Sequence, residues 1–174
     1  KKFVNLPGAI VWPKNYDDVV KMLKCVHQET GPIIPYGAGS GVCGGTVALK
    51  GGIIIDLKRL DKVITIDDKS LLVTAQAGIN GQILEEALNV RGYTLGHFPA
   101  SIYCSTLGGW LSTKAAGQLS TRYGKIEDMV VAVTAVLPTG EIISTKAVPR
   151  TSTGPTLMHL FVGSEGTLGI ILDA

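Results

Sequence analysis

The sequence predicts a fold of mixed helices and strands, arranged as one domain or as two tightly joined lobes. The 174 residues are 45% hydrophobic and only 17% charged, which is enough apolar surface for a sizeable core. Helical and strand patterns follow one another along the whole chain, without an internal repeat or a low-complexity linker. The clearest strand signal is a run of β-branched residues on both sides of a turn at residues 138–140.

The first set of elements lies before residue 57. Residues 15–31 predict an amphipathic helix, because Asn15 can cap its first turn and Gly31 can end it. Apolar residues at 33–36 and 53–56 predict two short buried strands. A glycine-rich loop separates them, so the predicted order is strand, helix, strand, loop, strand.

The second set begins near residue 63, where residues 63–67 and 71–77 predict two strands. A helix capped by Asn80 follows. Small residues between 105 and 117 predict a helix that packs very closely on its neighbour. The last expected elements are a hairpin over residues 129–145, a short helix near 157–161, a glycine turn at 163–166 and a strand at 168–172.

Composition and charge exclude several classes of partner. The 16 lysines and arginines against 14 acidic residues give a net charge of +2 without a basic stripe, so neither nucleic acid nor anionic lipid is expected. No apolar run is long enough to span a membrane. Cys25, Cys43 and Cys104 form no CxxC pair, which favours neither a zinc site nor a disulfide framework and fits a cytoplasmic protein. The expected partner is a small molecule, and no metal site is predicted.

The glycine loop is the strongest candidate for a binding site. Residues 35–45 contain five glycines, and Gly39, Gly41 and Gly44 match the GxGxxG spacing of dinucleotide-binding βαβ units. Only eight residues, GTVALKGG, separate Gly44 from the strand at Ile53, too few for the crossover helix of such a unit. No Gly-Lys-Ser/Thr follows, so a P-loop is excluded. A nest of backbone N–H groups that binds a diphosphate and a ligand-free turn both stay open.

Four motifs that follow one another along the chain identify the family that the sequence resembles. PYGAGSGVCGG, PASIYCSTLGGWLSTKAAG, RYGKIEDMVV and LFVGSEGTLGII resemble the FAD-binding domain of the vanillyl-alcohol oxidase and p-cresol methylhydroxylase (PCMH) flavoprotein superfamily. The resemblance covers nearly the whole chain. It implies an α+β fold of PCMH type with flanking helices, in which a lobe with a small parallel sheet (about 1–57) and a lobe with a mainly antiparallel sheet (about 58–174) enclose FAD. It also implies a C-terminal substrate domain that these residues do not contain.

The resemblance also assigns the cofactor-binding residues. The residues expected at the diphosphate are Pro35, Tyr36, Gly37, Ala38, Gly39, Ser40 and Gly41. Those expected to line the flavin and diphosphate are Ala100, Ser101, Ser105, Thr106, Gly108, Gly109, Thr113 and Ala116. Those expected at the adenosine end are Glu165, Gly166, Ile170 and Ile171. The hydroxyls could instead cap or pack a helix, and the Glu165 carboxylate could bond only its own turn.

The resemblance further implies noncovalent FAD. Some superfamily members attach the flavin through a histidine in the glycine loop, where this chain has Ser40, and Cys104 is out of register with the cysteine that other members use. Cys43 and Cys104 are therefore expected to be small buried residues. His97 is expected to be structural, because no metal-like partner accompanies it.

Within the superfamily, the expected function is that of the FAD-binding domain of an oxidoreductase that oxidises a 2-hydroxy acid, such as D-lactate or glycolate, by hydride transfer to flavin N5. The alternative is alkylglycerone phosphate synthase of ether-lipid synthesis, in which the flavin serves a carbon–oxygen exchange without net oxidation. The segments GGWLSTKAAG and PRTSTGP favour this alternative. A FAD-binding subunit without its own catalysis is a third possibility.

Catalytic residues cannot be assigned from these 174 residues, because the resemblance places them largely in the substrate domain. Arg150 is a weak candidate for binding an anionic organic substrate, since a guanidinium fork matches carboxylate or phosphate oxygens. The domain alone is expected to be inactive. Apolar surface left exposed without the substrate domain could support a homodimer.

Overall fold

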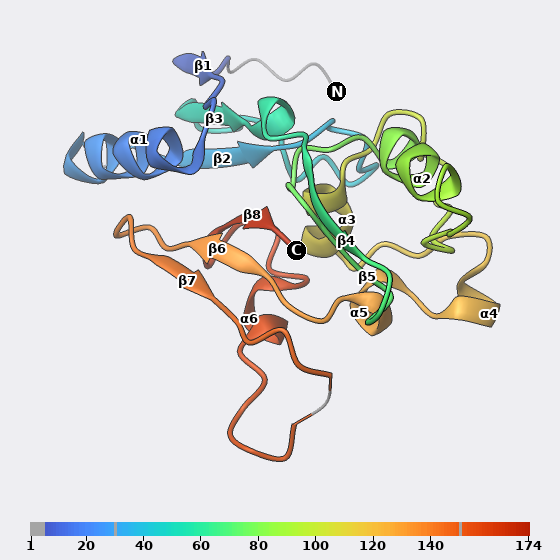
Figure 1. Cartoon of the computed structure of the whole chain (residues 1–174). Coiled ribbons are helices and arrows are strands. Elements are labelled where there is room, and N and C mark those ends of the chain that lie inside the picture. The colour runs from blue at the N-terminus through green and yellow to red at the C-terminus, as the bar shows by residue number, and fades with distance from the viewer. Residues whose placement is uncertain (1–5, 30, 150) are drawn as a thin grey trace.

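The structure, a computed structural model, describes residues 6–29, 31–149 and 151–174, in which eight strands form three small sheets (Figure 1). The strands are β1 (Ala9–Val11), β2 (Ile33–Tyr36), β3 (Ile53–Asp56), β4 (Val63–Asp67), β5 (Leu72–Ala75), β6 (Thr134–Val136), β7 (Ile142–Ser144) and β8 (Ile170–Asp173). The helical elements are α1 (Tyr16–Glu29), the 3-10 turn η1 (Leu57–Arg59), α2 (Gly81–Asn89), α3 (Leu107–Thr113), α4 (Ser120–Tyr123), α5 (Ile126–Met129) and α6 (Met158–Phe161).

The first sheet is parallel, in the order β1-β3-β2, and α1 lies beside it in Figure 1. The side chain of Asn15 accepts a hydrogen bond of 2.8 Å from the backbone N–H of Asp18, which confirms the predicted cap of α1. The apolar face of α1 packs through Val19 and Leu23 against Ile55 of the sheet. α1 provides the crossover from β1 to β2. The connection from β2 to β3 contains no helix; it is a long loop that leaves the carboxyl end of β2 and returns to the amino end of β3.

The remaining strands are antiparallel. β4 pairs with β5, and β6 lies between β7 and β8 (Figure 1). The main core fills the space around α3, with Trp110 and Leu111 packed among residues such as Ala135 and Ile171. One parallel and two antiparallel sheets with flanking helices confirm the predicted α+β class.

Several predicted elements are shorter than expected; the strand predicted at 71–77, for example, spans only Leu72–Ala75. The hairpin's first strand begins at Thr134 instead of residue 129, because the carboxylate of Asp128 accepts a 2.8 Å hydrogen bond from the N–H of Lys125 and supports α5. The helix expected at 105–117 ends at Thr113, because Lys114 adopts a left-handed conformation with φ of 51°. In the described part of the chain, no helix has both the length and the apolar character that a membrane span requires.

Candidate functional site

A cleft of about 510 Å³ lies where three segments of the chain meet. The glycine loop after β2 forms one wall, and α3 with the turn before it forms the opposite wall. The turn at residues 165–167 and the start of β8 line the remaining side. The three glycine-rich segments singled out in the sequence therefore come together around one space.

The glycine loop touches its surroundings at its start and faces open space in its middle. A Cβ atom at Gly37 would collide with the hydroxyl of Thr106, and one at Gly39 would collide with the hydroxyl of Tyr36. Gly39 also has a φ of +64°, which favours glycine. A Cβ atom at Gly41, in contrast, would meet nothing within 4 Å. Glycine is thus needed for close packing at the start of the loop, while Gly41 leaves the cleft clear.

The loop presents backbone donors that the protein does not use. Within the described residues, the N–H groups of residues 38–43 donate no hydrogen bond to the rest of the protein. Unpaired N–H groups in an exposed, glycine-rich turn are suited to binding phosphate oxygens. The donor set of this wall therefore fits a diphosphate.

The hydroxyl groups of the opposite wall already have partners. Thr106 caps α3 by accepting a 3.4 Å hydrogen bond from the N–H of Gly109, and Thr113 donates to the carbonyl of Gly109 at 2.9 Å. Ser105 accepts from the indole N–H of Trp110 at 2.7 Å and donates to the carbonyl of Ser101 at 2.8 Å. These bonds agree with the capping and packing roles considered above, and contact with a cofactor stays a prediction.

The turn after α6 is attached to the end of α3. The N–H of Gly163 donates to the carbonyl of Leu111 at 2.9 Å, and that of Glu165 donates to the carbonyl of Ser112 at 3.1 Å. A Cβ atom at Gly45 would lie 2.8 Å from Oε2 of Glu165, so this carboxylate reaches the glycine loop. Among the described residues the side chain of Glu165 has no hydrogen bond, so it does not bond its own turn.

All predicted cofactor-binding residues line this cleft except Ala100 and Ala116. Ala115, the neighbour of Ala116, lines it instead, and beside Ala100 the predicted residue Ser101 lines it. Ala115 takes the place of Ala116 because α3 ends before Lys114, so the helical spacing does not continue. Arg150 lies outside the described residues. Further residues of the cleft, which were not among the predicted cofactor-binding residues, are Ile33, Ile34, Val42, Cys43, Gly44, Gly45, Thr46, Leu57, Ala77, Trp110, Ser112, Thr167 and Gly169.

The charge of the cleft is unusual for an anion site. Glu165 is the one charged residue among the described residues that line it, and neither lysine nor arginine is present there. A bound diphosphate would therefore depend on backbone N–H groups. The described residues also contain no cluster of three or more metal-binding side chains.

The prediction that Cys43 and Cys104 are buried is wrong, because both are exposed. Cys43 belongs to the open part of the glycine loop, where few side chains could cover it. Cys104 lies in the turn before α3, and its Sγ makes a 3.4 Å contact with the carbonyl of Ser101.

A buried histidine supports α3 from outside the cleft. His97 is 1% exposed, and its ring lies edge-on to Trp110 with 4.7 Å between ring centroids. In the described structure neither ring nitrogen has a hydrogen-bond partner. Burial lowers the pKa of His97, which keeps the ring neutral.

Comparison with known proteins identifies the family. The model of a family described as "FAD binding domain" matches residues 7–146. Alkyldihydroxyacetonephosphate synthase of Caenorhabditis elegans is 44% identical, covering 99% of this chain and 30% of the relative. Glycolate oxidase subunit GlcD of Bacillus subtilis is 33% identical (99% and 37%), and mitochondrial D-lactate dehydrogenase [cytochrome] of Arabidopsis thaliana is 35% identical (99% and 30%).

A solved structure of an alkyldihydroxyacetonephosphate synthase superimposes on 95% of the chain with a TM-score of 0.85 and 39% identity, and the match covers 32% of that structure. The chain thus spans about a third of the length of these relatives. The matches confirm the two-lobed α+β fold of PCMH type that the motifs implied. The chain belongs to the FAD-linked oxidase family, as its FAD-binding domain.

Proposed function

We propose that the domain binds FAD noncovalently in the cleft between the glycine loop and α3, with the diphosphate on the backbone of residues 37–45. The observation that carries this proposal is the row of unused N–H groups at residues 38–43, beside the open space at Gly41. Ser40 stands where some superfamily members have the histidine that attaches flavin, which supports noncovalent binding.

The other walls of the cleft would hold the two ends of the cofactor. Ser105, Thr106 and Gly109 would line the flavin side, with their backbone fixed by the cap of α3. The carboxylate of Glu165 is a hydrogen-bond acceptor that could receive ribose hydroxyls beside Gly45. Bound FAD would supply the redox-active ring system, while the protein positions it and excludes water.

For the reaction we favour the type of alkyldihydroxyacetonephosphate synthase, which is the alkylglycerone phosphate synthase named above. The supporting observation is the 44% identity over 99% of the chain, against 33% and 35% for the glycolate oxidase and D-lactate dehydrogenase relatives. The proposed reaction exchanges the acyloxy group of a phosphate-bearing ester for the alkoxy group of an alcohol, giving an ether and a carboxylic acid. It needs no electron acceptor, and its substrate would bind largely to a further domain.

Oxidation of a 2-hydroxy acid is the second candidate function. It is supported by the matches to glycolate oxidase subunit GlcD and to D-lactate dehydrogenase, each over 99% of the chain. This reaction transfers a hydride from the substrate carbon and therefore needs an acceptor to reoxidise the cofactor. Cytoplasmic location and a homodimer stay predictions.

The cofactor is tested by the visible absorption spectrum of the purified protein before and after acid precipitation, with chromatography of the released flavin. FAD in the supernatant is the expected result. Flavin that stays with the precipitate would contradict noncovalent binding. A colourless protein that takes up no added FAD would contradict the site.

The reaction is tested on the protein that includes the substrate domain. Incorporation of a labelled fatty alcohol into an ether product without an electron acceptor would support the synthase type. Bleaching of the flavin by D-lactate or glycolate, without such incorporation, would support the second candidate and reject the first.

A further inference from the structure

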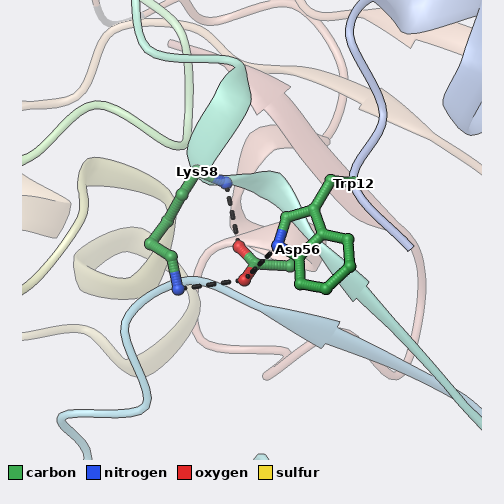
Figure 2. A network of polar contacts seen from close by, with 3 residues as sticks. All are labelled: Trp12, Asp56 and Lys58. Atoms are coloured by element: carbon green, nitrogen blue, oxygen red, sulfur yellow. Dashed lines mark hydrogen bonds and ion pairs between the residues drawn. The ribbon is translucent and has the colours of Figure 1, made fainter. Parts of the chain in front are cut away.

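A buried carboxylate lies at the carboxyl ends of the parallel strands, directly behind the glycine loop. Asp56, the last residue of β3, is 5% exposed. Its Oδ2 accepts a 3.0 Å hydrogen bond from the indole N–H of Trp12, and its Oδ1 accepts a 3.1 Å hydrogen bond from the backbone N–H of Lys58 (Figure 2). The Nζ of Lys58 completes the network at 2.9 Å from Oδ2. A buried carboxylate needs such partners, since leaving it unpaired is strongly unfavourable.

Lys58 links this carboxylate to the loop. Its Nζ lies 4.9 Å from the centroid of the Tyr36 ring, which is the geometry of a cation–π contact. Tyr36 is the last residue of β2 and the register partner of Asp56 on the neighbouring parallel strand. A Cβ atom at Gly39 would collide with the Tyr36 hydroxyl, so the ring lies directly against the loop. A continuous chain of contacts therefore runs from Asp56 through Lys58 and Tyr36 to Gly39.

Neither Asp56 nor Lys58 lines the cleft, so neither is placed to touch the cofactor. Their charges also compensate each other at 2.9 Å, so the pair adds little net charge to the anion site. The pair therefore acts on the site through the geometry of the loop. The pair keeps the Tyr36 ring in place, and the ring limits the conformations of the loop at Gly39, where φ is +64°.

We propose that Asp56 and Lys58 are positioning residues for the diphosphate loop, acting through the ring of Tyr36. This inference rests on the proposed function, since it concerns the affinity of the same site for FAD. A loop held in its binding conformation before the ligand arrives loses less conformational entropy on binding, which increases affinity.

The first test measures the Kd of FAD by fluorescence titration of the apoprotein. Lys58→Met is expected to raise the Kd by about threefold to tenfold, the range of a lost cation–π contact and ion pair. Lys58→Arg should stay within about twofold of the parent, because a guanidinium can pair with Asp56 and stack on Tyr36. Lys69→Met, in the exposed turn between β4 and β5, is the matched control and should leave the Kd unchanged.

The second test is a double-mutant cycle. If Lys58 acts through Tyr36, Lys58→Met should have no further effect on the Kd in a Tyr36→Leu background. A purely structural role of Lys58 would not produce this coupling. Losses of affinity that simply add, or equal losses in Lys58→Met and Lys58→Arg, would overturn the proposal.

A folding control keeps the test decisive, because Lys58→Met leaves the buried carboxylate short of a partner. The double variant Asp56→Asn/Lys58→Met removes both charges and should fold while still losing FAD affinity, as checked by circular dichroism and thermal melting of the apoprotein. Parent affinity in this variant would overturn the proposal. Absence of FAD binding in the parent would instead refute the proposed function itself.

Discussion

The two walls of the cleft use the same residue type for opposite purposes. In α3, the N–H of Gly108 donates to the carbonyl of Ala77 at 2.7 Å, and a Cβ atom at Gly108 would lie 2.8 Å from the Cβ of Ala77. In the glycine loop, a Cβ atom at Gly41 would meet nothing within 4 Å. Glycine thus allows close packing in α3, as it does at Gly37 and Gly39, and leaves space at Gly41 of the loop.

This difference separates stability from binding. Substitutions in α3 disturb a packed interior in which Trp110 and Leu111 are almost fully buried, so they should lower the free energy of unfolding. A substitution at Gly41, in the open middle of the loop, loses no protein contact and should affect mainly the ligand. Equal effects of the two kinds of variant on stability and on FAD binding would contradict this difference between the walls.

The largest expected effect is on the α3 wall. Gly108→Ala should lower the free energy of unfolding by about 1–3 kcal/mol, because the added methyl group overlaps Ala77 and backbone atoms that cannot move freely. Urea denaturation measures this change. Gly109→Ala is the matched control, because its methyl group would meet only the Thr106 hydroxyl at 3.2 Å. Equal unfolding free energies of the two variants would show that the packing at Gly108 is not tight.

The loop wall should show the opposite behaviour. Gly41→Ala should change the free energy of unfolding by no more than about 0.5 kcal/mol, since the methyl group meets no protein atom. It should raise the Kd of FAD by about tenfold, because the methyl group enters the space proposed for the diphosphate. Gly8→Ala, whose methyl group would make only an ordinary 3.5 Å contact with the carbonyl of Gly52, is the control. An unchanged Kd in Gly41→Ala would place the diphosphate elsewhere.

The elements and the main segments of the site could be predicted because their signals are local. Apolar runs fixed β2, β3 and β4 at the predicted residues, and Asn80 caps α2 as predicted by accepting from the N–H groups of Gln82 and Ile83. The early end of α3 could not be predicted, because a left-handed lysine at position 114 has no local signature. The contact of Glu165 with the glycine loop also depends on packing between distant segments, so no local pattern could reveal it.

The pH dependence of the free energy of unfolding tests whether water is excluded from the core behind α3. His97 is buried behind Trp110 with a lowered pKa, whereas in the unfolded chain it takes up a proton near pH 6.5. The unfolded state therefore binds more protons as the pH falls, and the stability that the neutral ring contributes is present above about pH 6.5 and lost below it. Relative to that of His97→Phe, the free energy of unfolding of the parent is expected to fall by at most about 1.4 kcal/mol per pH unit.

The measurement is the difference in free energy of unfolding between the parent and His97→Phe at several values between pH 7.5 and 5. At pH 7.5 the variant should be as stable as the parent or slightly more stable, because it removes two buried ring nitrogens that lack partners in the described structure. A difference that does not change with pH would mean that water reaches His97.

The smallest expected effect concerns a hydrogen bond between α1, which packs on the parallel sheet, and β8. Tyr16 of α1 donates a 2.7 Å hydrogen bond to Oδ2 of Asp173 at the end of β8. Burial, together with this bond, raises the pKa of Tyr16 to about 12 from 10.0. Because the folded state holds the proton more tightly, the contribution of Tyr16 to stability is complete below pH 10 and is lost as the pH rises from 10 to 12.

Tyr16→Phe should therefore be less stable than the parent at pH 9, and the difference should shrink towards pH 12. Denaturation at pH 9, 10 and 11 measures it, with Tyr103→Phe as the control because Tyr103 is 78% exposed. The effect should be small, since Tyr16 is only half-buried and water competes for its hydroxyl. If Tyr16→Phe also leaves the Kd of FAD unchanged at neutral pH, the shape of the cleft depends on the apolar core that contains Val19 and Leu172, and the polar bond adds only to stability.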